Sequence, residues 1–143
     1  MNNQDSETRV VEPLAKFHAQ VYRNGRIAIP GNEREYFGLD KHDIVNLVIR
    51  KVVGGKIVSR GQFWAQLTVH GRLTIPNGLR VELDIKEGDQ IEVLLIDFIK
   101  LKNKVGDKAY RLFQAVKSGK YFIIDEDEER KLLENPYFLL NGK

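Results

Sequence analysis

The apolar positions of this chain first alternate as expected for a strand. In residues 16–23 every second side chain is apolar, which is typical of a half-buried strand. The pair Asn24-Gly25 favours a tight turn with positive φ at both residues, and residues 26–29 predict the returning strand of a hairpin. Pro30 ends this strand, because proline has no amide hydrogen to donate to a ladder.

A short helix and a long strand are predicted next. Residues 31–37 predict the helix, and Gly38 is a natural stop at its C-terminal end. Residues 44–53 are rich in β-branched side chains and predict a long strand. Gly54-Gly55 predicts a second tight turn, with residues 56–59 as its return strand.

The same signals recur 46 residues later. Residues 25–30, Gly-Arg-Ile-Ala-Ile-Pro, return as residues 71–76, Gly-Arg-Leu-Thr-Ile-Pro. The identical pairs at this offset outside that segment are Phe17/Phe63, Ala19/Ala65, Gln20/Gln66, Arg34/Arg80 and Asp43/Asp89. A register kept over about thirty residues without a gap indicates a duplicated structural unit. One such unit is too small to bury a sufficient core alone, so the two copies are expected to pack together.

The last part of the chain has a different pattern. Residues 107–118 have helical spacing, residues 121–124 predict a brief strand, and Asp125 with Glu128 forms a capping-box sequence at the start of another helix. We therefore divide the chain into a flexible N-terminal arm (1–14), repeat one (15–60), repeat two (61–102) and an α-rich C-terminal extension (103–143).

Composition narrows the class of protein. A hydrophobic fraction of 42% and a charged fraction of 30% are typical of a soluble globular protein. No apolar run approaches the roughly 18–20 residues of a membrane span, and no secretory signal is visible, so we expect a cytoplasmic protein without a membrane partner. The chain has no cysteine, which excludes disulfides, thiol catalysis and cysteine-ligated zinc.

The sequence offers little that predicts an enzyme. It has no set of a nucleophile with a base, no cofactor loop and no metal-ligand spacing around His18, His42 or His70. The acidic run at residues 125–129 is better explained by helix capping than by metal binding. We therefore expect no catalytic residues, no cofactor and no metal.

Charge is distributed unevenly over a net value of +3. Residues 15–60 hold nine lysines and arginines against four acids, whereas residues 61–97 hold three against six. If both repeats contact a polyanion, they cannot contribute equally.

The repeated order of elements resembles the AbrB/SpoVT/MazE swapped-hairpin family. That order is a strand, a Gly-Arg turn, Ile-x-Ile-Pro or its close variant, a short helix with an arginine, a turn with an aspartate and an apolar strand. The resemblance covers residues 16–58 and 62–101. It implies a mainly β fold with short helices, in which two tandem repeats interleave hairpins into one small barrel, plus the α-rich extension.

Members of that family are mostly DNA-binding transcription regulators and antitoxins. In the family, arginines at the Gly-Arg turn and in the short helix contact double-stranded DNA. The first strand often carries basic residues, but here alanine and glutamine hold those positions in both repeats. Nearby basic residues of repeat one are the substitutes we expect. The DNA-binding candidates are thus Lys16, Arg23, Arg26, Arg34, Arg72 and Arg80.

Alternatives remain at each level. Arg26 and Arg72 also suit the exposed start of a strand, and Arg34 and Arg80 also suit pairing with Asp43 and Asp89 inside the fold. A basic stretch between Lys100 and Lys120 is either a solvated face or an extension of the DNA footprint. The main hypothesis is a transcription regulator. The alternative is an antitoxin or adaptor whose extension, with its apolar ending at residues 137–140, binds a partner protein or a second copy of the chain.

Overall fold

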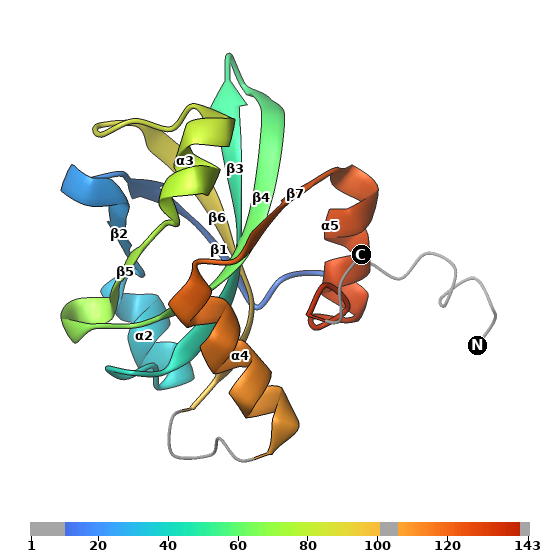
Figure 1. Cartoon of the computed structure of the whole chain (residues 1–143). Coiled ribbons are helices and arrows are strands. Elements are labelled where there is room, and N and C mark those ends of the chain that lie inside the picture. Colours follow the sequence, from blue (N-terminus) through green and yellow to red (C-terminus); the bar gives the residue numbers. More distant parts are fainter. Residues whose placement is uncertain (1–10, 101–105, 141–143) are drawn as a thin grey trace, which may run out of the picture.

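The computed structural model describes residues 11–100 and 106–140, and it is mainly β with two antiparallel sheets and four short α-helices (Figure 1). The large sheet has the strand order β1-β6-β3-β4-β7, and β2 and β5 form the small sheet. The strands are β1 Ala15–Gln20, β2 Arg26–Ala28, β3 Ile44–Val53, β4 Lys56–Gln66, β5 Arg72–Thr74, β6 Gln90–Ile99 and β7 Tyr121–Ile124. The helices are α2 Gly31–Phe37, α3 Asn77–Leu83, α4 Asp107–Ser118 and α5 Glu126–Glu134, with short 3-10 turns η1 Arg23–Gly25 and η2 Val69–Gly71.

This arrangement confirms the predicted mainly β class with short helices. The described strands form two separate sheets and do not close into one barrel. The predicted arm lies outside the described residues up to residue 10, and so does the boundary between repeat two and the extension. Among the described residues, no helix is long and apolar enough to cross a membrane.

The two repeats pair their strands with each other. β1 of repeat one pairs with β6 of repeat two, from Ala15 opposite Leu95 to Gln20 opposite Gln90. β2 likewise pairs with β5, and β3 with β6. The predicted hairpin of β1 with β2 is therefore wrong.

The turn itself has the predicted backbone. Asn24 and Gly25 have φ of 63° and 74°, and the equivalent His70 and Gly71 have 59° and 67°. The N–H of Tyr22 donates to Arg26 O across the turn at 2.8 Å, but the two strands part beyond it, because backbone groups further from the turn bind the other repeat. The N–H of Val21, for example, donates to Asp89 O at 2.8 Å.

The boundary between the repeats falls inside a strand. The sequence predicts two separate strands on either side of residues 60–61, but β4 runs unbroken from Lys56 to Gln66. Arg60 and Gly61 pair with β3 on one side and with β7 on the other, so both edges of the backbone are used. A Cβ on Gly61 would lie 2.4 Å from Leu79 Cδ1, so helix α3 packs directly on this part of the backbone.

Both faces of the large sheet are buried, each by a different layer. One face packs against β2, β5, α2 and α3 in a core that includes Ile27, Ile75 and Leu79. The other face packs against the extension, where Trp64 meets Leu112 and Leu132. Burial on both faces explains the nearly continuous apolar run of β3. In Figure 1 the small sheet and α5 accordingly lie on opposite sides of the large sheet.

The extension is folded as its sequence predicts. α4 ends at Gly119, whose φ of 67° is left-handed, and β7 joins the edge of the large sheet beside β4. The capping box of Asp125 and Glu128 is present at the start of α5. Glu129, the next residue of the acidic run, is buried and binds both Arg50 and Arg60.

Candidate functional site

The small sheet presents arginines on its outward side. Ile27 lies opposite Leu73 in the β2–β5 pair, and both are buried in the core. Because side chains alternate along a strand, the neighbouring pairs point away from the core. These pairs are Arg26 opposite Thr74 and Ala28 opposite Arg72. The exposed Arg26 of repeat one therefore stands at one end of the small sheet, and the exposed Arg72 of repeat two stands at the other end.

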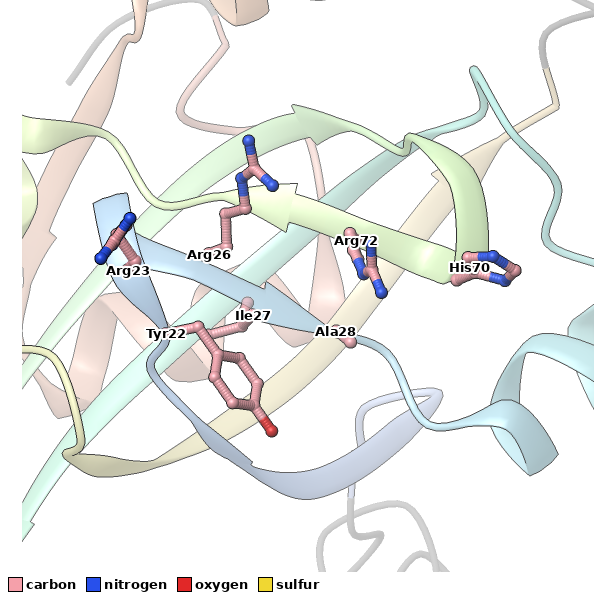
Figure 2. Close-up of a pocket in the computed structure, with 7 residues that line it drawn as sticks. All are labelled: Tyr22, Arg23, Arg26, Ile27, Ala28, His70 and Arg72. Atoms are coloured by element: carbon pink, nitrogen blue, oxygen red, sulfur yellow. The ribbon is translucent and has the colours of Figure 1, made fainter.

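The outward side contains a hollow of about 400 Å³. We call this surface the arginine face; the residues that line it are Tyr22, Arg23, Arg26, Ile27, Ala28, His70 and Arg72. Figure 2 shows these residues along the two paired strands, with Tyr22, Arg23, Arg26, Ile27 and Ala28 from repeat one and His70 and Arg72 from repeat two.

The helix arginines brace the turns of the opposite repeat. Arg34 Nε donates to Ile29 O at 3.0 Å, and its side chain lies over Gly71, where an added Cβ would be 2.2 Å from Arg34 Cδ. Arg80 Nε donates to Ile75 O at 3.1 Å and lies over Gly25 with a corresponding distance of 2.2 Å to its Nε. Glycine is therefore needed in the Gly-Arg turn both for its positive φ and for this close approach.

The aspartates that recur in the two repeats cap turns. Asp43 Oδ2 accepts from the N–H of Asp40 at 2.7 Å, and Asp89 Oδ2 accepts from the N–H of Lys86 at 2.8 Å. Both therefore cap the turn before a long strand, as their position in the sequence indicates. The hydrogen bonds from Arg34 and Arg80 Nε go to backbone carbonyl oxygens.

Three of the six predicted DNA-binding residues lie together in the hollow: Arg23, Arg26 and Arg72. Arg34 and Arg80 are half-buried on α2 and α3, each against the turn glycine of the opposite repeat. Lys16 is not brought to the hollow, because it lies on β1 with its Nζ 3.4 Å from Glu92 Oε2.

Sequence reasoning missed two residues of this surface. The sequence places Tyr22 on the outer side of the first strand and His70 in the turn of repeat two, and it assigns neither residue to the DNA-binding surface. The signal that identifies them is their place beside the two repeated Gly-Arg turns. No group of three histidines, aspartates or glutamates that suits a metal ion occurs within the described residues.

Comparisons with known proteins give one solved relative. No family model matches the chain, and no curated protein matches it. The solution structure of PHS018 from Pyrococcus horikoshii is 40% identical, with a TM-score of 0.59, and the match covers 64% of this chain and 99% of that one. The chain belongs to the same family as PHS018. Since the match leaves part of the present chain uncovered, that part has no counterpart in PHS018.

In this relative of PHS018, the acids of repeat two are engaged away from the arginine face. Glu92 binds Arg50 and Lys16 on the large sheet, and Asp97 accepts from Tyr137 Oη at 2.7 Å. Burial acts to raise the pKa of Glu92, but the hydrogen bond from Arg50 and the charges of Lys16 and Arg50 lower it overall. Glu92 is thus paired with two cations and Asp97 with a neutral hydroxyl, and neither carboxylate lines the hollow.

Two further acids of repeat two also have partners outside the hollow. Asp84 lies beside Lys86 and Lys51, at 3.1 Å and 3.4 Å, and the hydrogen bond from Lys86 leads the effects that lower its pKa. Glu82 accepts from the hydroxyl of Tyr121. Among the described residues, no carboxylate lines the hollow. The arginine face is therefore positive although repeat two as a whole is acidic.

Proposed function

We propose that this protein is a DNA-binding transcription regulator of the swapped-hairpin class, and that the arginine face contacts double-stranded DNA. The single observation that supports this most is the gathering of Arg23, Arg26 and Arg72 on one exposed surface, which is lined by no carboxylate from residues 11–100 or 106–140. Guanidinium groups suit this task because their planar fork binds phosphate oxygens or the O6 and N7 of guanine with two parallel hydrogen bonds.

The interlaced strands support the assignment to that class. Each repeat contributes one strand to the small sheet, so the two Gly-Arg turns are held at its opposite ends with related orientations. Such a pseudo-twofold surface suits a duplex, whose two strands are themselves related by twofold axes. Contacts with phosphates would supply most of the affinity, and contacts with base edges would supply the sequence preference.

Arg34 and Arg80 have a positioning role in this proposal. Each donates to a carbonyl oxygen of its own repeat and covers the turn glycine of the other. They therefore hold in place the backbone from which Arg26 and Arg72 project, and they connect the turn of each repeat to the helix of the other.

The alternative of an antitoxin-like tail has less support. That hypothesis expects an extension that is disordered until a partner binds. Residues 106–140 instead supply Leu112, Leu132 and Leu139 to a core that they share with the large sheet.

A salt titration of DNA binding tests the proposal. The full-length protein and its Arg26→Ala variant are titrated against mixed-sequence duplex DNA at several salt concentrations. Each phosphate contact contributes about 0.9 to the slope of log K against log[salt], so the variant is expected to bind more weakly and with a slope flatter by about one unit.

Arg130→Ala is the matched control, because Arg130 is an exposed arginine of α5 that pairs with Asp127 and lies on the other side of the large sheet. It should leave both affinity and slope unchanged. A wild-type protein that does not bind DNA, or an Arg26→Ala slope equal to that of the wild type, would contradict the proposal.

A further inference from the structure

We infer that the arginine face, if it binds DNA as proposed, binds in one fixed orientation on a site that is not palindromic. A homodimer presents two identical halves and therefore selects a palindromic sequence. Here both halves belong to one chain, so they are free to differ. The structure shows two differences, one in the turns and one in their surroundings.

The first difference is chemical. The residues that differ at equivalent places on the two halves include Tyr22/Thr68, Arg23/Val69, Asn24/His70 and Ala28/Thr74; all of these are exposed except Ala28, which is half-buried. Arg23 offers a charged fork to phosphate or guanine, whereas Val69, with 47% of its surface exposed, offers only apolar contact such as that with the methyl group of thymine. Repeat one therefore brings two arginines to its half of the DNA and repeat two brings one.

The second difference is created by the extension. Trp64 of β4 is 3% exposed because α4 and β7 cover it, whereas the equivalent residue of β1, His18, has 71% of its side chain exposed. The extension thus occupies the outer side of one repeat and leaves the corresponding side of the other open.

Helix α4 of the extension also places a lysine, Lys117, beside repeat two, with no counterpart from the extension beside repeat one in the described part of the chain. A groove of about 460 Å³ separates the end of α4 from repeat two. Lys117 and Ser118 form one wall, and Thr68 and Thr74 belong to the other. Thr74 is the residue that faces Arg26 across the small sheet, so the groove adjoins the arginine face. Lys117 is exposed on this wall of the groove.

Two steps test the orientation. First, the full-length protein selects duplexes from a random 20-base-pair pool, and the selected sequence is expected to lack twofold symmetry. Second, the selected duplex is cleaved from a defined place on the protein. The chain has no native cysteine, so Glu35→Cys and Val81→Cys each carry a single iron chelate.

Glu35 and Val81 suit this test because they are exposed, lie at equivalent positions of α2 and α3, and do not line the hollow. A fixed orientation predicts that each label cuts one flank of the site, and that the two labels cut opposite flanks. A palindromic or absent consensus, or equal cutting of both flanks by each label, overturns the inference while DNA binding itself stands. Failure of the wild-type protein to bind any duplex overturns the proposed function as well.

Lys117→Ala provides a second readout. It should shorten the hydroxyl-radical footprint on one flank only, whereas Lys131→Ala, an exposed lysine of α5, should leave the footprint unchanged. An unchanged footprint in Lys117→Ala, or equal shortening at both flanks, would show that the extension does not distinguish the two halves.

Discussion

Replacing Glu129 with glutamine removes the negative charge that joins helix α5 to the large sheet. Glu129 is only 6% exposed and lies between two arginines of neighbouring strands. Its Oε1 accepts from Arg50 Nε and Arg60 Nε, each at 3.0 Å, and its Oε2 accepts from Arg50 Nη2 at 2.5 Å. Glutamine has nearly the same shape but neutralises neither guanidinium group, so the substitution tests the charge and not the packing.

The cost follows from what remains after the change. Breaking a buried ion pair by removing one partner typically costs about 3–5 kcal/mol, because the other charge is left without compensation. Arg50 keeps its contact with Glu92 Oε1 at 2.6 Å, and about 15% of the side chain of each arginine reaches solvent. We therefore expect a loss at the lower end of that range, about 3 kcal/mol in the free energy of unfolding. For a chain of this size such a loss lowers Tm by about 10 °C.

Urea unfolding measures this loss directly. Circular dichroism follows the whole fold, and the fluorescence of the single tryptophan, Trp64, follows the core between the extension and the sheet. Glu126→Gln is the matched control: Glu126 is an exposed acid in the first turn of the same helix, where its interaction with the helix dipole contributes only about 0.3–1 kcal/mol. A loss for Glu129→Gln below about 1 kcal/mol, or one no larger than that of the control, would refute the reasoning from a buried network.

Three further substitutions test other parts of the structure. Glu92→Gln should make the free energy of unfolding less dependent on pH in acid. The folded state lowers the pKa of Glu92, so its contribution to stability is present above the ordinary value of 4.5 and disappears as pH falls through the folded-state value. Unfolding measured from pH 3 to 7 checks this, and a pH dependence equal to that of the wild type would contradict the prediction. Gly71→Ala should lower the free energy of unfolding in urea by about 2 kcal/mol or more, because the left-handed backbone and a clash with Arg34 both oppose the new side chain. Gly55→Ala, also left-handed but in open space, should lower it by only about 1 kcal/mol. Equal losses would disprove the close approach of Arg34 to Gly71. Leu132→Ala should cost about 2–5 kcal/mol in thermal unfolding, since the side chain is fully buried under the sheet, and a cost below 1 kcal/mol would show that α5 packs loosely.

The local elements could be predicted because local chemistry determines them. Gly38 and Gly119 end their helices in the left-handed conformation that their sequence position indicates, and Asp125 caps its helix as expected. The positive φ values at Asn24 and Gly25 likewise follow from residue type. Each of these features depends on a few neighbouring residues, so the sequence alone contains the necessary information.

The pairing of strands could not be predicted in the same way. An alternating pattern says which side of a strand is buried, but it does not say which other strand lies beside it. The pattern of residues 16–29 is therefore compatible with a local hairpin, although the two strands pair with those of repeat two. The unbroken β4 was missed for a related reason, because Gly61 looks like a linker until its contact with Leu79 is known.

The candidate site was predicted in part. The repeat located Arg26 and Arg72, and their shared surface follows from the pairing of β2 with β5. It could not show that Arg34 and Arg80 turn back to carbonyl oxygens, since this depends on how each helix meets the opposite turn. The packing of the extension had one visible signal: tryptophan at position 64 replaces the histidine of position 18, which indicates a buried partner for one repeat only.

The continuous strand β4 has a consequence for how the molecule is assembled. In a protein built from two separate copies, the halves must find each other by diffusion, and dilution drives them apart. Here the covalent backbone delivers the second copy next to the first at a high effective concentration, with its alignment already set. Assembly is therefore part of the folding of one polypeptide, and the fraction of complete molecules does not depend on how much of the protein a cell makes.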